Sequence, residues 1–156
     1  MKFTDGFWQI RPGVEVLYAQ EVYDLEQSSD GQGLQITAPT KVIGSRGDTL
    51  NRPILTVSIH SPLPDVIGVT IEHHQGGKPP LGFSLPGATS GHAEVSVGET
   101  EGTLTSGSLT LRAARGEPWS LSFESDGRVL TSSGHRSVGY AGLQADAQVD
   151  AGVVGS

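Results

Sequence analysis

The chain has 156 residues, the size of one domain, and its 17 acidic and 10 basic side chains give a formal charge of −7. An acidic surface repels phosphate backbones, and no stretch reaches the roughly 20 apolar residues of a membrane helix, so we expect neither a nucleic-acid nor a membrane partner. The absence of cysteine excludes disulfides and thiolate metal sites and, with no secretory signal visible at the start, predicts a cytoplasmic location.

Alternation of apolar and polar residues predicts strands along most of the chain. Residues 14–27 should form one long strand or two strands across a bulge, because the apolar parity slips near Ala19. Further strands are expected at 33–39, 54–61, 67–74, 108–114, 119–125 and 129–133. No segment shows ten residues of clear helical period. The pattern therefore predicts an all-β fold, an antiparallel β-sandwich of about eight to ten short strands.

The turns between these segments predict which strands pair. Asp126-Gly127 favours a two-residue hairpin turn because both positions accept positive φ, so 119–124 should pair with 129–133. The same strand should pair with 108–113 on its other side. Residues 77–91, rich in glycine and proline, are expected to be a loop. We expect a domain over 1–140 and a flexible tail or linker over 141–156.

Two adjacent histidines, His73 and His74, raise the question of a metal or acid–base site. Side chains alternate across a strand, so the two rings should point to opposite faces and cannot share a metal ion. His73 follows the parity of Val69 and Ile71 and should face the interior or its rim, with His74 more exposed. His60 would lie on the order of 20 Å from His73 along a hairpin. We therefore expect a structural His73 and no catalytic, cofactor-binding or metal-binding residue.

Two short motifs have simple structural interpretations. Arg46–Asp48 spells RGD, which we interpret as a turn before the next strand. The segment SGHRSVG at 133–139 falls short of the nucleophile motif G-x-S-x-G because His135 stands where glycine is required.

The aromatic residues offer a possible sugar-stacking platform. The candidates are Phe7, Trp8, Trp119 and Tyr140. Trp119 shares its parity with Leu121 and Phe123, which predicts a core position, and one of Phe7 and Trp8 should face outward.

Four segments carry a resemblance to a known family. They are MKFTDGFWQIRPGV at the start, IGVTIEHHQG at 67–76, SGSLTLRAARGEPWSLSFESDGRVLTSSG at 106–134, and GY at 139–140. In this order and spacing they resemble the N-terminal region of bacterial alpha-xylosidases of glycoside hydrolase family 31. The resemblance implies a galactose-mutarotase-like sandwich, followed in those enzymes by a (β/α)₈ barrel of about 250 residues. In the family two aspartates on that barrel perform retaining hydrolysis. No aspartate of this sequence matches those motifs, so none is assigned a catalytic role.

The resemblance thus predicts a non-catalytic N-terminal domain that packs on the barrel of a parent enzyme and helps shape access for α-xylosides or related oligosaccharides. Whether the chain is itself an enzyme stays open. The resemblance covers only part of that N-terminal sandwich, so we expect the domain over 1–140 to be partial and its sandwich incomplete. Such a sandwich should expose edge strands and an apolar patch, and could self-associate through them. The alternative is a stand-alone carbohydrate-binding β-sandwich module. We expect no cofactor in either case.

Overall fold

The computed structural model describes residues 10, 13–50, 52–73 and 93–143. Within these ranges no helix is long and apolar enough to cross a membrane. The same ranges hold eleven strands and one 3-10 turn, which confirms the predicted all-β fold. The strands are β1 (Val14–Tyr18), β2 (Asp24–Gln27), β3 (Gly33–Pro39), β4 (Ile54–Leu63), β5 (Val66–Glu72), β6 (Glu94–Val97), β7 (Glu101–Ser106), β8 (Leu109–Ala114), β9 (Leu121–Ser125), β10 (Arg128–Ser133) and β11 (Gly139–Leu143), and the turn is η1 (Arg46–Thr49).

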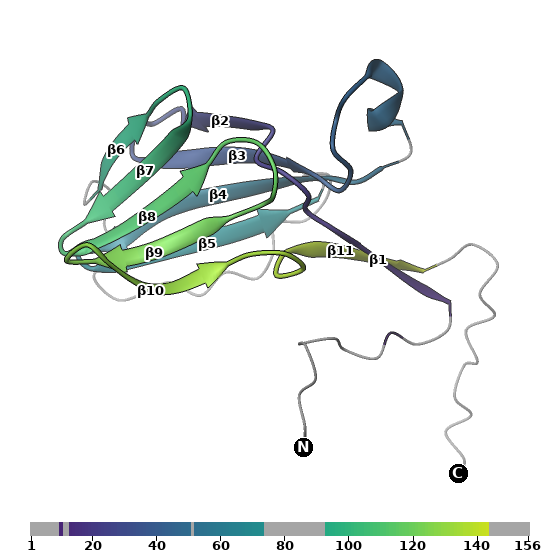
Figure 1. Cartoon of the computed structure of the whole chain (residues 1–156). Coiled ribbons are helices and arrows are strands. Elements are labelled where there is room, and N and C mark those ends of the chain that lie inside the picture. Colours follow the sequence, from purple (N-terminus) through teal and green to yellow (C-terminus); the bar gives the residue numbers. More distant parts are fainter. Residues whose placement is uncertain (1–9, 11–12, 51, 74–92, 144–156) are drawn as a thin grey trace, which may run out of the picture.

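Two antiparallel sheets face each other, and a third sheet, a ribbon of two strands, projects from them (Figure 1). One sheet has the order β2-β3-β4-β5 and the other the order β10-β9-β8-β7-β6. Across the sandwich, β2 faces β6 and β7, and β5 faces β8. The four-stranded sheet ends at β5, which faces β8, whereas the larger sheet continues past β8 with β9 and β10. The ribbon pairs β1 with β11, with Val14 opposite Leu143 at its tip.

The core lies between the two sheets and follows the alternation of the strands. Inward-facing apolar side chains alternate with polar ones that face outward, as expected for a sandwich. The four-stranded sheet and the larger sheet both contribute fully buried residues: Leu25, Leu34, Ile36, Leu55, Val57, Ile59, Leu104, Leu111, Ala113 and Leu121.

The predicted strand pairings from 108 to 133 are confirmed. β8 pairs with β9, which places Leu111 opposite Phe123, and β9 pairs with β10 with a bulge between Val129 and Thr131. At the turn between β9 and β10, Asp126 and Gly127 have φ of 51° and 72°. Both values are positive, as the Asp-Gly pair predicted.

The segment 14–27 forms two strands, but they belong to different sheets rather than to one bulged strand. Between them, Ala19 and Val22 are buried, and the Val22 amide donates to the Gly116 carbonyl at 2.9 Å. The parity slip near Ala19 therefore marks the point where the chain passes from the ribbon into the sandwich.

Trp119 is a core residue, as predicted, with 2% of its surface exposed. It lies just before β9, and its Nε1 donates to Ser133 Oγ at 3.2 Å. A tryptophan buried in this way can offer no stacking surface to a sugar.

Three strands were not expected from the sequence: β6, β7 and β11. The domain boundary predicted at residue 140 stays a prediction, although β11 runs from Gly139 to Leu143 across it. The loop predicted at 77–91 and the end of the strand predicted at 67–74, which includes His74, lie outside the described residues.

The sequence correctly predicts which face of β5 carries Val69 and Ile71, but the expectation that these side chains are buried is wrong. Val69 and Ile71 pair directly with Ile59 and Val57, which are buried, so all four side chains are on the core face of the sheet. Yet Val69 is 38% and Ile71 is 45% exposed. Among the described strands β5 pairs only with β4, so these side chains are at a sheet edge.

A polar contact joins the two sheets at the end where β4 turns into β5. The buried Ser61 and Ser106 hydroxyls are 2.7 Å apart, and the Asp65 amide donates to Ser106 Oγ at 3.1 Å. Asp65 also accepts hydrogen bonds from Ser108. These bonds satisfy polar groups that would otherwise be costly to bury.

Candidate functional site

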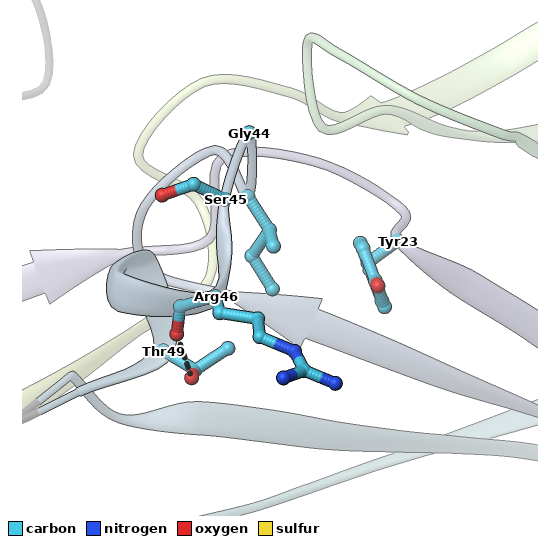
Figure 2. A pocket seen from close by; sticks show the side chains of 6 residues that line it. Tyr23, Gly44, Ser45, Arg46 and Thr49 are labelled. Atoms are coloured by element: carbon cyan, nitrogen blue, oxygen red, sulfur yellow. Dashed lines mark hydrogen bonds between the residues drawn. The ribbon is translucent and has the colours of Figure 1, made fainter.

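A surface hollow of about 350 Å³ lies between the start of β2 and the loop that carries η1. The residues that line it are Tyr23, Ile43, Gly44, Ser45, Arg46 and Thr49. Figure 2 shows the Arg46 side chain extending from η1 toward the space beside the Tyr23 ring. Tyr23 is 53% exposed, which is uncommon for a large aromatic side chain and leaves its ring accessible.

The loop around η1 is held by one carboxylate. Asp48 accepts hydrogen bonds from the Gly44 amide at 3.1 Å, the Ser45 amide at 2.7 Å and the Ser45 hydroxyl at 2.9 Å, and it pairs with Lys41. These partners lower the pKa of Asp48 to about 2, first through the hydrogen bond from Lys41 and then through Ser45. Asp48 is therefore charged at neutral pH, the form that these hydrogen bonds and the pairing with Lys41 favour.

A second carboxylate ties the loop to the body of the sandwich. Glu21 is only 8% exposed, and its Oε1 accepts a hydrogen bond from the Ile43 amide at 2.8 Å. Since Glu21 precedes β2 by three residues, the same short segment positions both this anchor and Tyr23. The two walls of the hollow are thus fixed relative to one another.

The interpretation of Arg46–Asp48 as a turn is confirmed by η1. An RGD tripeptide acts as an adhesion ligand through a free aspartate, but here the Asp48 carboxylate is engaged by its own loop. Arg46 is the exposed charged side chain of the tripeptide, and its guanidinium borders the hollow.

The histidines do not assemble into a site. His73 is exposed at the end of β5, and its ring centroid is 4.5 Å from that of Tyr140, which packs against the core. This places His73 at the rim, while its comparison with His74 stays a prediction. His60 is on the opposite face of β4 from Ile59 and lies over Gly68. In the described part of the chain, no three His, Asp or Glu side chains are grouped to hold a metal ion.

The aromatic platform expected from the sequence is not assembled in the described residues. Trp119 is buried and Tyr140 is half-buried against His73, whereas Phe7 and Trp8 lie outside the described residues. The exposed ring beside a hollow is that of Tyr23, which sequence reasoning did not select. No local sequence pattern could have identified Tyr23 as part of a site, because the other lining residues follow it by 20 or more positions in the sequence. The hydrogen bond between Glu21 and Ile43 brings the two segments together only in the folded chain.

An ionic cluster on the outer face of the larger sheet has a structural role. Arg112 of β8 pairs with Glu101 of β7 and with Glu124 of β9, the latter at 3.5 Å. The pKa of Arg112 is raised, mainly by its hydrogen bond to Glu101. The three strands place these side chains next to one another on one face, so the cluster is a cross-strand pairing of opposite charges.

Comparison with known proteins relates this sandwich to one class of enzyme. The fold defines an antiparallel β-sandwich domain, and no protein-family model matches the chain. Alpha-xylosidase XylQ of Lactiplantibacillus pentosus is 32% identical over 133 residues, which cover 85% of this chain and 17% of that enzyme. An alpha-xylosidase of Emericella nidulans is 31% identical over 150 residues, which cover 91% of this chain and 19% of the relative.

These matches confirm the resemblance indicated by the sequence motifs: the chain is related to the N-terminal region of alpha-xylosidases of glycoside hydrolase family 31. The chain spans less than one fifth of the length of the curated relatives that it matches.

Proposed function

We propose that the chain acts as the non-catalytic N-terminal β-sandwich domain of an alpha-xylosidase-like glycoside hydrolase. The observation that carries this proposal is the similarity to two alpha-xylosidases over 85% and 91% of the chain but only 17% and 19% of the relatives. In the parent enzyme the domain would pack on a catalytic barrel and help shape access for α-xylosides or related oligosaccharides. Hydrolysis itself would belong to carboxylates on that barrel.

The geometry of the sandwich supports a partner domain on two counts. The ribbon pairs Val14 with Leu143, so the chain enters and leaves the sandwich side by side at the ribbon tip. The connection to a following domain would therefore leave the sandwich through β11, beside β1. The exposed core-face residues Val69 and Ile71 on β5 offer an apolar strip that further strands of the parent protein could cover.

The test begins with the coding sequence downstream of residue 156. We expect an in-frame barrel that carries two aspartates, and a full-length product that hydrolyses an aryl α-xyloside while the 156-residue chain alone does not. Hydrolysis would be followed by release of the chromogenic phenol. A stop codon with no barrel-encoding sequence nearby would contradict the proposal, and so would hydrolysis by the purified 156-residue chain.

A second candidate function is carbohydrate binding by this domain. The observation that favours it is the hollow between Tyr23 and Arg46, where an exposed aromatic ring and a hydrogen-bond donor border the same space. Aromatic rings beside polar groups are typical of sugar sites, because they offer a stacking surface and an orienting contact.

A further inference from the structure

We propose that the hollow bordered by Tyr23 and the Arg46 guanidinium binds a single pyranose unit of a carbohydrate. This inference rests on the second candidate function, carbohydrate binding, and assigns it to particular residues. It does not depend on whether the parent protein is a xylosidase.

The hollow is formed before any ligand arrives. Asp48 fixes the loop through Gly44, Ser45 and Lys41, and the nearly buried Glu21 holds Ile43. Five lining residues come from this loop, and the sixth, Tyr23, follows Glu21 by two positions. A ligand that binds here therefore need not order the loop, and it avoids the loss of conformational entropy that weakens binding to mobile segments.

The lining offers one apolar surface and one strong donor. Tyr23 and Ile43 supply the apolar surface, and Arg46 supplies the donor. The hydroxyl groups of Ser45 and Thr49 donate within the loop, to Asp48 Oδ2 at 2.9 Å and to the Arg46 carbonyl at 3.2 Å. The ligand that fits must therefore present an apolar face to the ring and acceptor oxygens to the guanidinium. A pyranose does both, because its axial C–H groups form an apolar face and its hydroxyl groups surround the edge.

Charge and size narrow the class of ligand further. Lys41 is paired with Asp48, so Arg46 supplies the positive charge at the hollow. With a net charge of −7 on the chain, one arginine is too little to retain a polyanion such as a nucleic acid or a polyphosphate. A volume of about 350 Å³ is at the small end of ligand pockets, which range over about 300–1,000 Å³. The hollow suits one sugar unit at the end or the side of an oligosaccharide.

The experiment is a titration of the ¹⁵N-labelled 156-residue chain, followed by amide chemical shifts. Methyl α-xyloside, maltose and glucuronate are each added to well above millimolar concentration, so that neutral and acidic pyranoses are distinguished. We expect saturable shifts at residue 23 and at 43–49 with at least one of these sugars. Tyr23→Ala and Arg46→Ala should each weaken that binding about tenfold or more, whereas Tyr23→Phe should retain it.

Arg128→Ala is the matched control, since it removes an exposed arginine on β10 and should leave the affinity unchanged. The amide spectrum of each variant shows whether it is folded. Because Arg46 is exposed, Arg46→Ala should fold normally, so it tests the proposal even if Tyr23→Ala is destabilised. The proposal is overturned if none of the sugars shifts these amides, or if binding is saturable but unaffected by both alanine variants. Either result leaves the relation to alpha-xylosidases intact, because that relation is tested by the downstream sequence and by hydrolysis.

Discussion

Asp65 accepts two hydrogen bonds from Ser108, one from its amide at 2.6 Å and one from its hydroxyl at 2.9 Å. The two residues are in turns of different sheets, so this contact fastens one end of the sandwich. Asp65 has a positive φ of 60°, a conformation that Asp and Asn tolerate better than most residues. Its side chain and its backbone are therefore both suited to the position.

Replacing Asp65 should test the charge and the acceptor separately. The hydrogen bonds from Ser108 lower the pKa of Asp65, so its folded value is below its unfolded value. Such a group stabilises the fold fully above the unfolded pKa of about 3.9, and that stabilisation is lost as the pH falls through the folded pKa. We expect Asp65→Asn to lower the unfolding midpoint at pH 7, and Asp65→Ala to lower it more.

Urea unfolding of the three proteins at pH values from 7 down to 3 is the measurement. The difference between wild type and Asp65→Asn should narrow as the pH drops below about 4. A difference that stays constant with pH would show that the charge of Asp65 has no part in the contact.

The loop around η1 should depend on the ion pair between Lys41 and Asp48. Because the hydrogen bond from Lys41 is the largest cause of the low pKa of Asp48, Lys41→Ala should raise that pKa from about 2 toward its ordinary value. Ser45→Ala should raise it too, since Ser45 is the next cause. Carboxyl ¹³C chemical shifts followed against pH measure the pKa directly. Arg52→Ala, outside the loop, is the control, and an Asp48 pKa that is the same in all four proteins would refute the assignment.

Packing around Gly102 offers a test of how the two sheets meet. A Cβ built at Gly102 of β7 would overlap the side chain of Leu25 on β2, which is 1% exposed and has no room to retreat. We expect Gly102→Ala to cost about 1–3 kcal/mol of unfolding free energy, as overpacking of a core does.

A double-mutant cycle with Leu25→Val identifies the source of that cost. The smaller side chain should relieve the overlap, so the double variant should be more stable than the sum of the single effects predicts. Strict additivity within about 0.5 kcal/mol would mean that the overlap with Leu25 is not what destabilises Gly102→Ala.

The paired residues Ile71 and Val57 should respond differently to the same kind of change. Val57 is fully buried, so Val57→Thr should cost about 1–3 kcal/mol by burying a hydroxyl group. Ile71 is 45% exposed at the edge, so Ile71→Thr should change stability by no more than about 0.5 kcal/mol. Denaturant unfolding of both variants measures the two costs, and equal costs would contradict the edge position of Ile71.

The edge strand β5 should also mediate self-association of the isolated chain. Sedimentation velocity from micromolar to near-millimolar protein should show a growing share of larger species for the wild type. The double variant Val69→Thr, Ile71→Thr should remain monomeric at concentrations where the wild type associates, because it removes the apolar strip on β5, the edge strand of its sheet among the described residues. A wild type that stays monodisperse over the whole range would count against association through this edge.

The strands with clear alternation could be predicted from sequence, and the reason is visible in β4 and in the hairpin of β9 and β10. In β4, Leu55, Val57 and Ile59 alternate with polar residues, and all three are buried. In β7 the inward positions are Gly102, Leu104 and Ser106, so two of the three carry no apolar signal. Residues of the opposite sheet complete the packing at these two positions: Leu25 fills the space at Gly102, and Ser61 forms a hydrogen bond with Ser106. A single sequence cannot show such complementarity.

The exposure of the β5 side chains and the assembly of the candidate site could not be predicted from sequence, because both depend on which segments lie next to each other in the fold. The parity of Val69 and Ile71 was readable, but their exposure follows from the place of β5 in the sheet order. The turn at Arg46–Asp48 was also readable. Its approach to Tyr23 was not, because a hydrogen bond between Glu21 and Ile43 brings together segments that no local pattern connects.

The ribbon of β1 and β11 also determines how the domain would respond to mechanical load. Its strands are antiparallel, with Val14 opposite Leu143 at the tip and Tyr18 opposite Gly139 at the base. A pulling force applied through Val14 and Leu143 would act first on the outermost pair, and the hydrogen bonds would then open one after another rather than all together. The ribbon would therefore unzip at low force, and the sandwich core would carry no tension until the last pair had parted.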